Sequence, residues 1–448
     1  MYKKLYALID CSSFYCSCER AFRADLKGKA ICVLSNNDGC IISLTPDTKA
    51  LGFKMGTPYY QIKDDLAQKG VAVFSSNYCL YADMSKRIVK IIRSFSDFVE
   101  QYSIDESFVQ FEANTNNIEQ ERIRLHALAE EIHFTILKKT GVPVRVSIAE
   151  TKTLAKVGSE YTKCLIKQGI VPAVCFWEHP DKDGYMKTLP VNDVWGIGRQ
   201  WSKKLEMSGI KTAKDLSMAN PDLLKKNYSI VMERTARELS GFSCILFELV
   251  APERKSLVRS RMFSHKITDA KYLKQAISFH LARASEKLRS DKLMATELSI
   301  FMSTGRHTEI TKYSYAHQTL LRPTNDIIIL AEVADKLFKE CYVKNDKFGN
   351  EYKYSKAGVS LSGFSSIDKQ SEPLFDIGIT ERPALMKILD GLNRKFGKHT
   401  VVLASMGVPK KLQKIEAAKD DAIEWGMKRG LMSKRFTTVW EEILQVKI

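Results

Sequence analysis

Residues 98–111 have the sequence FVEQYSIDESFVQF, in which two alternating apolar runs flank a break that carries Asp105 and Glu106. Such alternation is typical of half-buried strands, and the short break predicts that the two strands pair antiparallel. The stretch KLYALID at 4–10 predicts a further strand that ends at Asp10. The sequence therefore places three acids at the ends of strands, where a buried carboxylate is costly unless a positive charge pairs with it.

On either side of this stretch, the first 180 residues alternate between expected strands and helices. Short apolar runs predict the strands, and apolar residues at spacings of three and four predict the helices. The order βαβ…αββαβα indicates an α/β or α+β domain. The expected elements are a helix capped by Ser12 or Ser13 and running through Arg20, a strand at 30–35, helices at 45–51, 82–96 and 117–139, a strand at 142–149 and a helix at 152–167.

Residues 255–363 have the expected order strand, helix, strand, strand, helix, strand. This βαββαβ order predicts a four-stranded sheet with both helices on one face. Helical pieces broken by glycine and proline fill 181–241, a partly apolar stretch at 242–254 indicates a linker, and 381–396 is helix-like. The chain is therefore expected to be an α+β protein of several domains.

The composition is that of a folded protein. Of the 448 residues, 44% are hydrophobic and 27% are charged, which excludes a disordered or collagen-like chain. No apolar run approaches the roughly 18 residues of a membrane-spanning helix, and the first apolar run is too short for a signal peptide, so we expect a cytoplasmic protein. The ten cysteines include no CxxC pair, which favours reduced thiols over a zinc site.

Positive charge is in excess and unevenly distributed. Lysine and arginine outnumber aspartate and glutamate by 69 to 52, which gives a net charge of +17. Within 251–363 the numbers are 20 and 12, so this segment alone carries +8. Such an excess favours a polyanionic partner, either nucleic acid or a membrane surface. A generally basic proteome is the alternative explanation.

Asp10, Asp105 and Glu106 are candidate metal ligands. Mg²⁺ prefers carboxylates together with phosphate oxygens, and two such ions can activate an attacking hydroxyl and stabilise a leaving pyrophosphate. The alternative is that these are ordinary solvent-exposed acids at strand ends and turns.

Other residues near the acids are candidates for substrate contacts. Tyr15 lies five residues after Asp10, so a substrate at the acids would meet its ring, whereas core packing is the expected role of Phe14. A solvated lysine face is the alternative role for the basic residues. The lysines that could grip a triphosphate are Lys49 and, near one face of a predicted helix, Lys152, Lys156 and Lys163.

The stretch VWGIGRQWSKKLEMSGI at 194–210 is typical of a helix-hairpin-helix. In that motif, backbone N–H groups of the hairpin and a helix N-terminus contact a DNA phosphate. The hairpin consists of Gly196, Ile197 and Gly198. A glycine pair alone is a weak signal, and the whole pattern is moderately specific.

Several motifs together resemble one family of enzymes. In chain order they are ALIDCSSFYCSCE, LSNNDGCIIS, ALGFKMGTPYY, SSNYCLYADMS, YSIDESF, TKTLAK, VWGIGRQWSKKL and RFTTVWEEILQVK. This ordered set is similar to the Y-family DNA polymerases, which copy damaged templates, and it extends over essentially the whole chain. SIDE alone would be a poor signal, whereas the ordered set is highly specific.

The resemblance implies roles for individual residues. The acids Asp10, Asp105 and Glu106, with the backbone carbonyl of Cys11, match the ligands of two Mg²⁺ ions. Tyr15 matches the steric gate that excludes the 2′-hydroxyl of a ribonucleotide. The residues matched to other parts of the dNTP are Phe14, beneath the sugar, and Lys163, at the triphosphate.

The resemblance also implies a right-hand polymerase with palm, fingers, helical thumb and little finger. Its implied parts are a palm at 1–12 and 80–170, fingers at 13–79, a thumb at 171–241, a linker at 242–250, a little finger at 251–363 and a tail at 364–448.

The chain departs from the family pattern in the fingers and the tail. Where many members have Tyr and Arg three residues apart as phosphate contacts, this chain has Pro46 and Lys49, and only Lys49 keeps the charge. A peptide for the sliding clamp is expected to begin at Gln370, with Leu374 and Phe375 filling a pocket on the clamp, although its spacing is off by one residue. A plain loop is the alternative.

The function implied by the resemblance is error-prone, template-directed DNA synthesis past damaged bases in the SOS response. The implied partners are primer–template DNA, a UmuD-type dimer, a RecA filament and the sliding clamp, with no membrane contact. One alternative is a DNA-binding subunit that has lost catalysis, which the presence of all three acids disfavours. A nucleotidyl cyclase is another, and the hairpin and the +8 segment argue against it because a cyclase does not grip a duplex.

Overall fold

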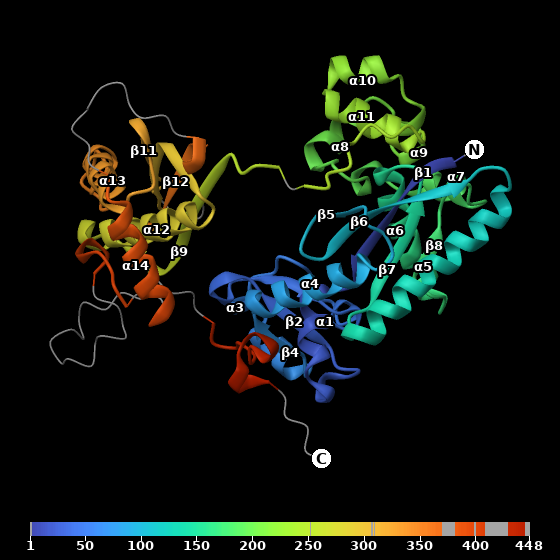
Figure 1. Ribbon diagram of the computed structural model, residues 1–448, viewed down its shortest axis with the longest axis horizontal. Coiled ribbons are helices and arrows are strands. Elements are labelled where there is room, and N and C mark those ends of the chain that lie inside the picture. The colour runs from blue at the N-terminus through green and yellow to red at the C-terminus, as the bar shows by residue number, and fades with distance from the viewer. Residues whose placement is uncertain are drawn as a thin grey trace. The chain divides into compact units, whose positions relative to one another are not determined.

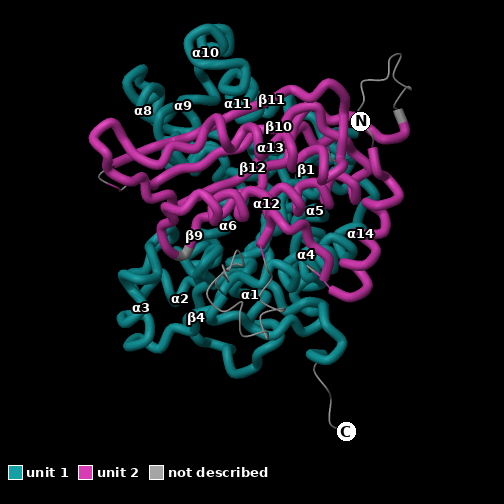
Figure 2. The backbone as a smooth tube through the Cα atoms, turned by 90° about the vertical axis from the view of Figure 1, so that its left-hand side faces the viewer, with its two compact units in different colours: residues 1–251, 429–448 teal, residues 252–428 magenta. Residues whose placement is uncertain are grey.

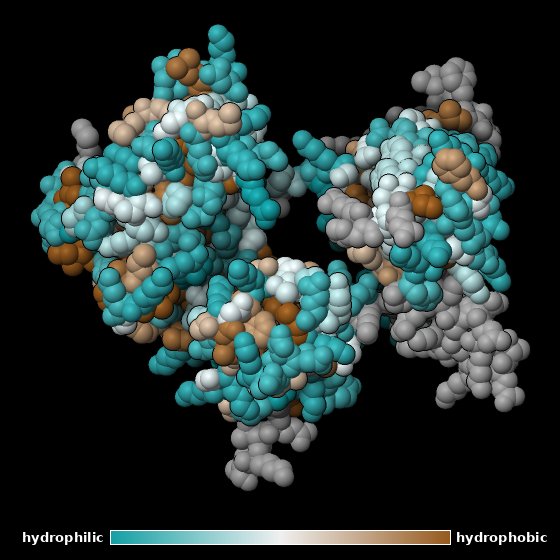
Figure 3. Space-filling model, turned by 180° about the vertical axis from the view of Figure 1, so that it is seen from behind, coloured by the Kyte–Doolittle hydropathy of each residue, from teal (hydrophilic) through white to brown (hydrophobic). Residues whose placement is uncertain are grey.

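The computed structural model describes residues 2–250, 252–305, 308, 310–369, 381–397, 400–407 and 429–443 (Figure 1). The chain forms two compact units, which are Met1–Ala251 with Arg429–Ile448, and Pro252–Lys428 (Figure 2). Among the described helices, none is long and apolar enough to cross a membrane. The faces of both units seen in Figure 3 are mostly hydrophilic, with small separate apolar patches.

Unit 1 is built on a five-stranded sheet with the order β5-β6-β1-β7-β8. The central strand β1 is apolar on both faces, because Leu5, Ala7 and Ile9 enter one core and Leu8 enters another. Helices α4 and α5 cover the first core, and α6 lies on the second. The elements are β1 (Tyr2–Cys11), β5 (Val99–Gln101), β6 (Glu106–Asn114), β7 (Val144–Ala149), β8 (Ala173–Cys175), α4 (Tyr78–Ile92), α5 (Ile118–Thr140) and α6 (Lys152–Lys167).

A second, three-stranded sheet lies in the same unit, between β1 and α4 in sequence. Its order is β3-β2-β4, in which β2 and β4 are parallel, and it has a small core of its own around Cys32, Leu34 and Ile41. The elements are α1 (Phe14–Ala21), β2 (Ile31–Leu34), β3 (Ile41–Leu44), α2 (Pro46–Ala50), α3 (Tyr59–Gln68) and β4 (Ala72–Ser75).

Short helices follow β8 and pack as a cluster that shares its core with α6. Several begin with a side-chain cap: the hydroxyl of Thr212 accepts a hydrogen bond from the backbone N–H of Asp215, and Asn220 caps the next helix in the same way. The elements are α7 (Lys182–Thr188), α8 (Arg199–Met207), α9 (Ala213–Met218), α10 (Pro221–Asn227) and α11 (Ile230–Leu239).

Unit 2 has the βαββαβ order that the sequence predicts. Its antiparallel sheet has the order β11-β10-β12-β9, and the helices α12 and α13 share a core with one face of it (Figure 1). The elements are β9 (Ser256–Ile267), α12 (Ala270–Ser290), β10 (Leu293–Ser303), β11 (Tyr313–Thr324), α13 (Ile327–Cys341), β12 (Tyr354–Ser366) and α14 (Pro383–Lys395).

The structure differs from the sequence-based expectation in the three-stranded region. Strands β3 and β4 and helix α3 were not expected, and α4 begins at Tyr78, four residues earlier than predicted. Ser13 occupies the N-cap position of α1, but it makes no capping hydrogen bond. Its φ of 46° turns the chain sharply, and its hydroxyl donates instead to the carbonyl of Leu44, 2.9 Å away.

Candidate active site

Three charged side chains form a row across the central sheet of unit 1. Asp10 on β1 is the direct partner of Glu106 on β6 and of Arg145 on β7. Directly opposed residues of antiparallel strands project from the same face. The row is largely buried, since the side chains of Asp10, Glu106 and Arg145 are 14%, 20% and 16% exposed.

Each carboxylate of the row has a cationic partner. Arg145 forms an ion pair with Asp10, and Nζ of Lys156, on α6, lies 2.5 Å from Oε1 of Glu106. The hydroxyl of Ser159 is 3.5 Å from Oδ2 of Asp10. Arg145 was not predicted from the sequence, although it is the one charged residue in β7 and could have been found by that signal.

Asp105 lies beside the row, in the turn between β5 and β6. Its carbonyl accepts a hydrogen bond from the backbone N–H of Cys11, at 2.9 Å. The hydroxyl of Ser103 donates to the Asp105 carboxylate and accepts from the backbone N–H groups of Asp105 and Glu106, at 3.2 and 3.1 Å. These bonds fix the turn, so the three predicted acids all lie at one end of the β1–β6 pair.

The acids influence one another electrostatically. Burial raises the pKa of Glu106, Lys156 opposes that rise, and the charges of Asp10 and Asp105 add to it. Three carboxylates thus lie beside two cationic partners, Arg145 and Lys156, and the surplus negative charge is one that a further cation would relieve.

The acids have the chemistry that divalent cations bind, but in this structure they do not form a complete set of metal ligands. Across the described residues, no three Asp, Glu, His or Cys side chains are grouped closely enough to hold a metal ion. The reason is visible in the ion pairs, since Asp10 is directed to Arg145 and Glu106 to Lys156. Carboxylate and backbone carbonyl oxygens are nonetheless the donors that Mg²⁺ prefers.

Tyr15 lies near the acids on α1, surrounded by aromatic rings. Its ring stacks on Tyr81, with centroids 4.5 Å apart and planes 18° apart, and meets the edge of Tyr78 at 6.0 Å. Burial raises the pKa of Tyr15, and the charges of Tyr78 and Asp105 add to the rise. Phe14 is buried in the core of unit 1, as expected for a packing residue.

The lysines predicted for a triphosphate fall into different environments. Lys49 on α2 is exposed, and Lys163 on α6 is half-exposed beside Glu160. Lys152 does not belong with them, because its side chain is 2% exposed and its Nζ lies 2.5 Å from the Glu100 carboxylate. Of the three lysines predicted near one face of this helix, only Lys163 is open to solvent, because Lys152 is buried and Lys156, 16% exposed, is paired with Glu106.

The predicted hairpin precedes α8. Gly196 has a φ of 85°, a conformation that favours glycine, and Gly198 is the N-cap of α8. The indole N–H of Trp195 donates to the hydroxyl of Tyr102, at 3.3 Å, and Nζ of Lys156 lies over both rings. The hairpin is thus attached to the side chain that pairs with Glu106.

Unit 2 presents an open sheet face opposite its helices. Neighbouring strands place Ser260, Gly358, Phe301 and Tyr315 in one row across this face. The next row contains Lys356, whose Nζ lies 5.7 Å from the centre of the Phe301 ring. Small, aromatic and basic side chains on a flat sheet are suited to contact with a nucleic-acid backbone.

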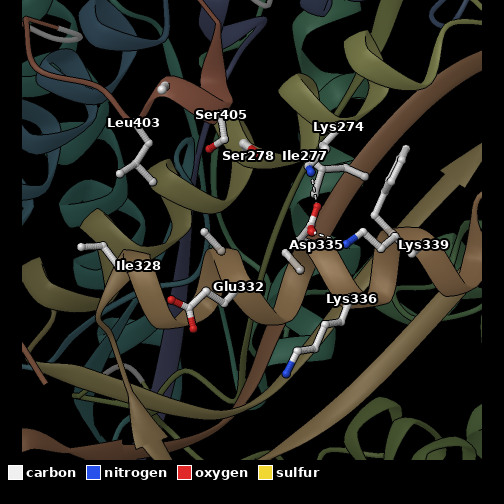
Figure 4. A pocket seen from close by; sticks show the side chains of 14 residues that line it. Lys274, Ile277, Ser278, Ile328, Glu332, Asp335, Lys336, Lys339, Leu403 and Ser405 are labelled. Atoms are coloured by element: carbon white, nitrogen blue, oxygen red, sulfur yellow. Dashed lines mark ion pairs between the residues drawn. The ribbon is translucent and has the colours of Figure 1, made fainter. Parts of the chain in front are cut away.

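The helical side of unit 2 contains a cavity of about 570 Å³ between α12 and α13. Figure 4 shows Asp335 there, directed at Lys274 and Lys339, with which it forms ion pairs. The cavity holds none of the predicted site residues. The predicted clamp-binding residues Gln370, Leu374 and Phe375 lie outside the described part of the chain.

Family models match most of the chain. The impB/mucB/samB family matches residues 9–160, the C-terminal domain of that family matches 254–374, and a domain of unknown function, DUF4113, matches 383–446.

Similar proteins cover nearly the whole sequence. The chain is 39% identical to Protein UmuC of Salmonella typhimurium, over 99% of this chain and 100% of that protein. It is 27% identical to DNA polymerase IV of Bacillus velezensis, over 88% of this chain and 91% of that protein. The solved structure of a Y-family DNA polymerase chimera matches with a TM-score of 0.62 at 20% identity, over 80% of this chain and 98% of that chain. This last match shows that the fold is the Y-family fold.

Proposed function

This chain belongs to the impB/mucB/samB family, and from that premise we propose that it is an error-prone DNA polymerase that extends primers past damaged template bases in the SOS response. Its relatives include proteins named UmuC and DNA polymerase IV, and it is accordingly a DNA-directed DNA polymerase. The observation that carries the proposal is the placement of Asp10, Asp105 and Glu106 at one end of the central sheet, with Asp105 close enough to Tyr15 to contribute to its raised pKa.

The three acids would hold two divalent ions, with the backbone carbonyl of Cys11 as a further ligand. Ions bound there supply Lewis-acid activation of the primer 3′-hydroxyl and neutralise the triphosphate. Arg145 and Lys156 balance the carboxylate charges when no substrate is bound. They keep acids that are largely buried from repelling one another, so the site stays folded between catalytic cycles.

Tyr15 would select the sugar. A ring packed against the incoming nucleotide excludes a 2′-hydroxyl by its volume, and the stack on Tyr81 limits how far the ring can move. Phe14, fixed in the core, would support the sugar from below. Lys163 and Lys49, both accessible, would bind the triphosphate.

DNA would be gripped at two places. Backbone N–H groups of the hairpin at 196–198 and the start of α8 are suited to one phosphate. The open sheet face of unit 2, in the segment with a charge of +8, would lie along the duplex. We assign the roles of palm, fingers, thumb and little finger to the ranges expected from the sequence.

The proposed partners follow from the likeness to UmuC. They are a UmuD-type dimer, a RecA filament and, through residues 370–375, the sliding clamp. We expect activity to depend on the first two.

Primer extension tests the function directly. Purified protein is incubated with Mg²⁺, dNTPs and primed templates with or without one damaged base, in the presence and absence of UmuD-type and RecA partners. Extension past the damaged base supports the proposal. DNA binding without extension under every condition would instead favour a catalytically silent damaged-DNA-binding subunit.

A further inference from the structure

A segment from the matched domain of unknown function packs on unit 1. Residues 429–443 are called the strap below. The strap lies against the last residue of β4, Ser75, which forms two hydrogen bonds with Leu431. The backbone N–H of Ser75 donates to the Leu431 carbonyl at 3.0 Å, and the Leu431 N–H donates to the Ser75 hydroxyl at 2.9 Å. The strap is thus attached by specific hydrogen bonds at its start.

Further along, the strap is held by an aromatic stack and a hydroxyl. Phe436 is 3% exposed, and its ring stacks on Phe22 with centroids 4.8 Å and planes 11° apart. The hydroxyl of Thr437 donates to the Asp83 carboxylate on α4, at 2.8 Å. Burial of a whole aromatic ring removes a large apolar surface from water, which makes this a docked segment of unit 1.

The middle of the strap covers a buried acid. Glu19 on α1 is 0% exposed, and its Oε1 accepts hydrogen bonds from two hydroxyls, that of Ser433 at 3.1 Å and that of Tyr81 at 2.7 Å. Asn77 fixes Ser433 in turn, because its side-chain N–H groups donate to the Ser433 hydroxyl and to the carbonyl of Lys434, both at 3.0 Å. Ser433 therefore supplies one of the two hydroxyl hydrogen bonds to Oε1 of this carboxylate.

Tyr81 connects the buried acid to the sugar-selecting ring. Tyr15 and Glu19 are four residues apart on α1, and so lie on one side of the helix. Tyr81 touches both, through its hydroxyl to Glu19 and through its ring face to Tyr15. A continuous set of contacts thus runs from Ser433 through Glu19 and Tyr81 to Tyr15.

We propose that the strap fixes the orientation of Tyr15, with Ser433 and Glu19 as positioning residues for the choice between deoxyribonucleotides and ribonucleotides. This inference rests on the proposed role of Tyr15 as the sugar gate. A ring excludes a hydroxyl only while it cannot tilt. Loss of the Ser433 bond leaves the buried Glu19 carboxylate with fewer donors, which weakens the anchor of Tyr81 and lets both stacked rings move.

The test compares two single substitutions in the strap of the full-length protein. Ser433→Ala removes the bond to Glu19, and Thr437→Ala removes a bond to α4 that does not touch Glu19. We measure kcat/KM for a dNTP and the matching rNTP on an undamaged template. Ser433→Ala should lower the dNTP preference by roughly three- to tenfold, the scale of one buried hydrogen bond. Thr437→Ala should leave the preference within about twofold, and Ser433→Thr, which keeps the hydroxyl, should resemble wild type.

A double substitution separates the two proposals. Ser433→Ala should have no further effect on sugar preference in a Tyr15→Ala background, because the coupling acts through that ring. If Tyr15→Ala relaxes the preference and Ser433→Ala does not, the strap has no part in selection. If Tyr15→Ala leaves the preference for dNTP over rNTP unchanged, Tyr15 is not the sugar gate. The proposed role of the strap in sugar choice is then wrong as well.

A spectroscopic measurement tests the physical link without any catalysis. 3-Fluorotyrosine is placed at position 15 alone, and its ¹⁹F resonance is recorded in the protein without substrate. Ser433→Ala should shift and broaden the resonance, and Thr437→Ala should not. Equal spectra for both variants and wild type would overturn the coupling, even if the protein proved inactive on primers.

Discussion

Asp10 and Glu106 are direct cross-strand partners in the ladder between β1 and β6, so two negative side chains leave the same face of the sheet side by side. Like charges in this position destabilise a sheet, and Arg145 and Lys156 offset that repulsion from either side. The geometry of the acids depends on strand register. A slip of one residue would move Asp10 to the opposite face.

Removing the acids should remove catalysis and leave DNA binding. Asp105→Asn with Glu106→Gln should lower the rate of nucleotide addition by about a thousandfold or more, because two of the three proposed carboxylate ligands lose their charge. The affinity for primer–template DNA, measured by fluorescence anisotropy, should stay within about twofold. Glu112→Gln, an exposed position on the same strand, is the matched control and should extend primers normally. Normal extension by the double variant would show that these acids are not the metal ligands.

The volume of Tyr15 should decide sugar choice. Tyr15→Ala should raise rNTP incorporation relative to dNTP incorporation by roughly ten- to a hundredfold, since the removed penalty is steric overlap of about 1–3 kcal/mol. Tyr15→Phe keeps the ring and should behave like wild type. The check is kcat/KM for matched dNTP and rNTP. An unchanged preference in Tyr15→Ala would make Tyr15 a packing residue.

The open sheet face of unit 2 should contribute to the salt dependence of DNA binding. Each phosphate contact contributes about −0.9 to the slope of log affinity against log salt for duplex DNA. Lys356→Gln should therefore flatten the slope by about one contact. The matched control is Lys336→Gln, an exposed position on α13 in the helical layer, which should leave the slope unchanged. Equal slopes for both variants would mean that DNA does not lie on this face. Point variants are preferable to truncation at 251, which would also delete the strap from unit 1.

His280 should make unit 2 less stable in acid. Burial on α12, aided by the charges of Arg261 and Arg259 on β9, lowers the pKa of His280 from 6.5 to about 4. Between these values the unfolded chain binds a proton that the folded chain does not, so stability falls as the pH falls, and above pH 6.5 the effect vanishes. The loss at pH 5 should be about 2 kcal/mol.

Urea denaturation at pH 7.5 and pH 5.0 measures this loss. His280→Leu should reduce the difference in unfolding free energy between the two pH values, because the site can no longer take up a proton. His126→Gln, which changes a half-exposed histidine on α5, should not. If the pH dependence of His280→Leu matched that of wild type, His280 would titrate normally in the folded protein.

Lys152 should be needed for stability. Its ammonium donates to Glu100 at 2.5 Å and to the carbonyl of Leu246 at 2.6 Å, so Lys152→Met would leave a buried carboxylate unpaired at a cost of about 3–5 kcal/mol. Adding Glu100→Gln should restore most of the loss. Lys163→Met, which breaks an exposed pair on the same helix, should cost less than about 1 kcal/mol. In urea denaturation, a loss of less than about 1 kcal/mol for Lys152→Met would contradict the prediction.

Long, strongly patterned elements were predictable from the sequence. The six elements from β9 to β12 follow the expected order because each has enough residues to show its period. Strands β4 and β8, with four and three residues, were not predicted, and β4 pairs with β2 only through contacts between residues about 40 positions apart. The strand register that places Arg145 directly across from Asp10 is likewise a property of the folded sheet. It cannot be read from the spacing of these residues along the sequence.

Contacts distant in sequence were the least predictable. The sequence names Tyr15 and the acids through local motifs, but nothing near Ser433 or Phe436 indicates that they pack on α1 and α4. Lys152 and Lys156 look alike in the sequence, and only their neighbours Glu100 and Glu106 distinguish a buried structural pair from a pair in the candidate site.

The strap also delays the time at which unit 1 can complete its folding during synthesis. Ser433 follows Glu19 by 414 residues, and a ribosome adding about 5–20 residues per second needs roughly 20–80 s to make that stretch. Throughout this interval the nascent chain presents the ring of Phe22 without Phe436, and the carboxylate of Glu19 without Ser433 even once Tyr81 has been made. The contacts of Phe22 and Glu19 with the strap are therefore among the last that unit 1 can form.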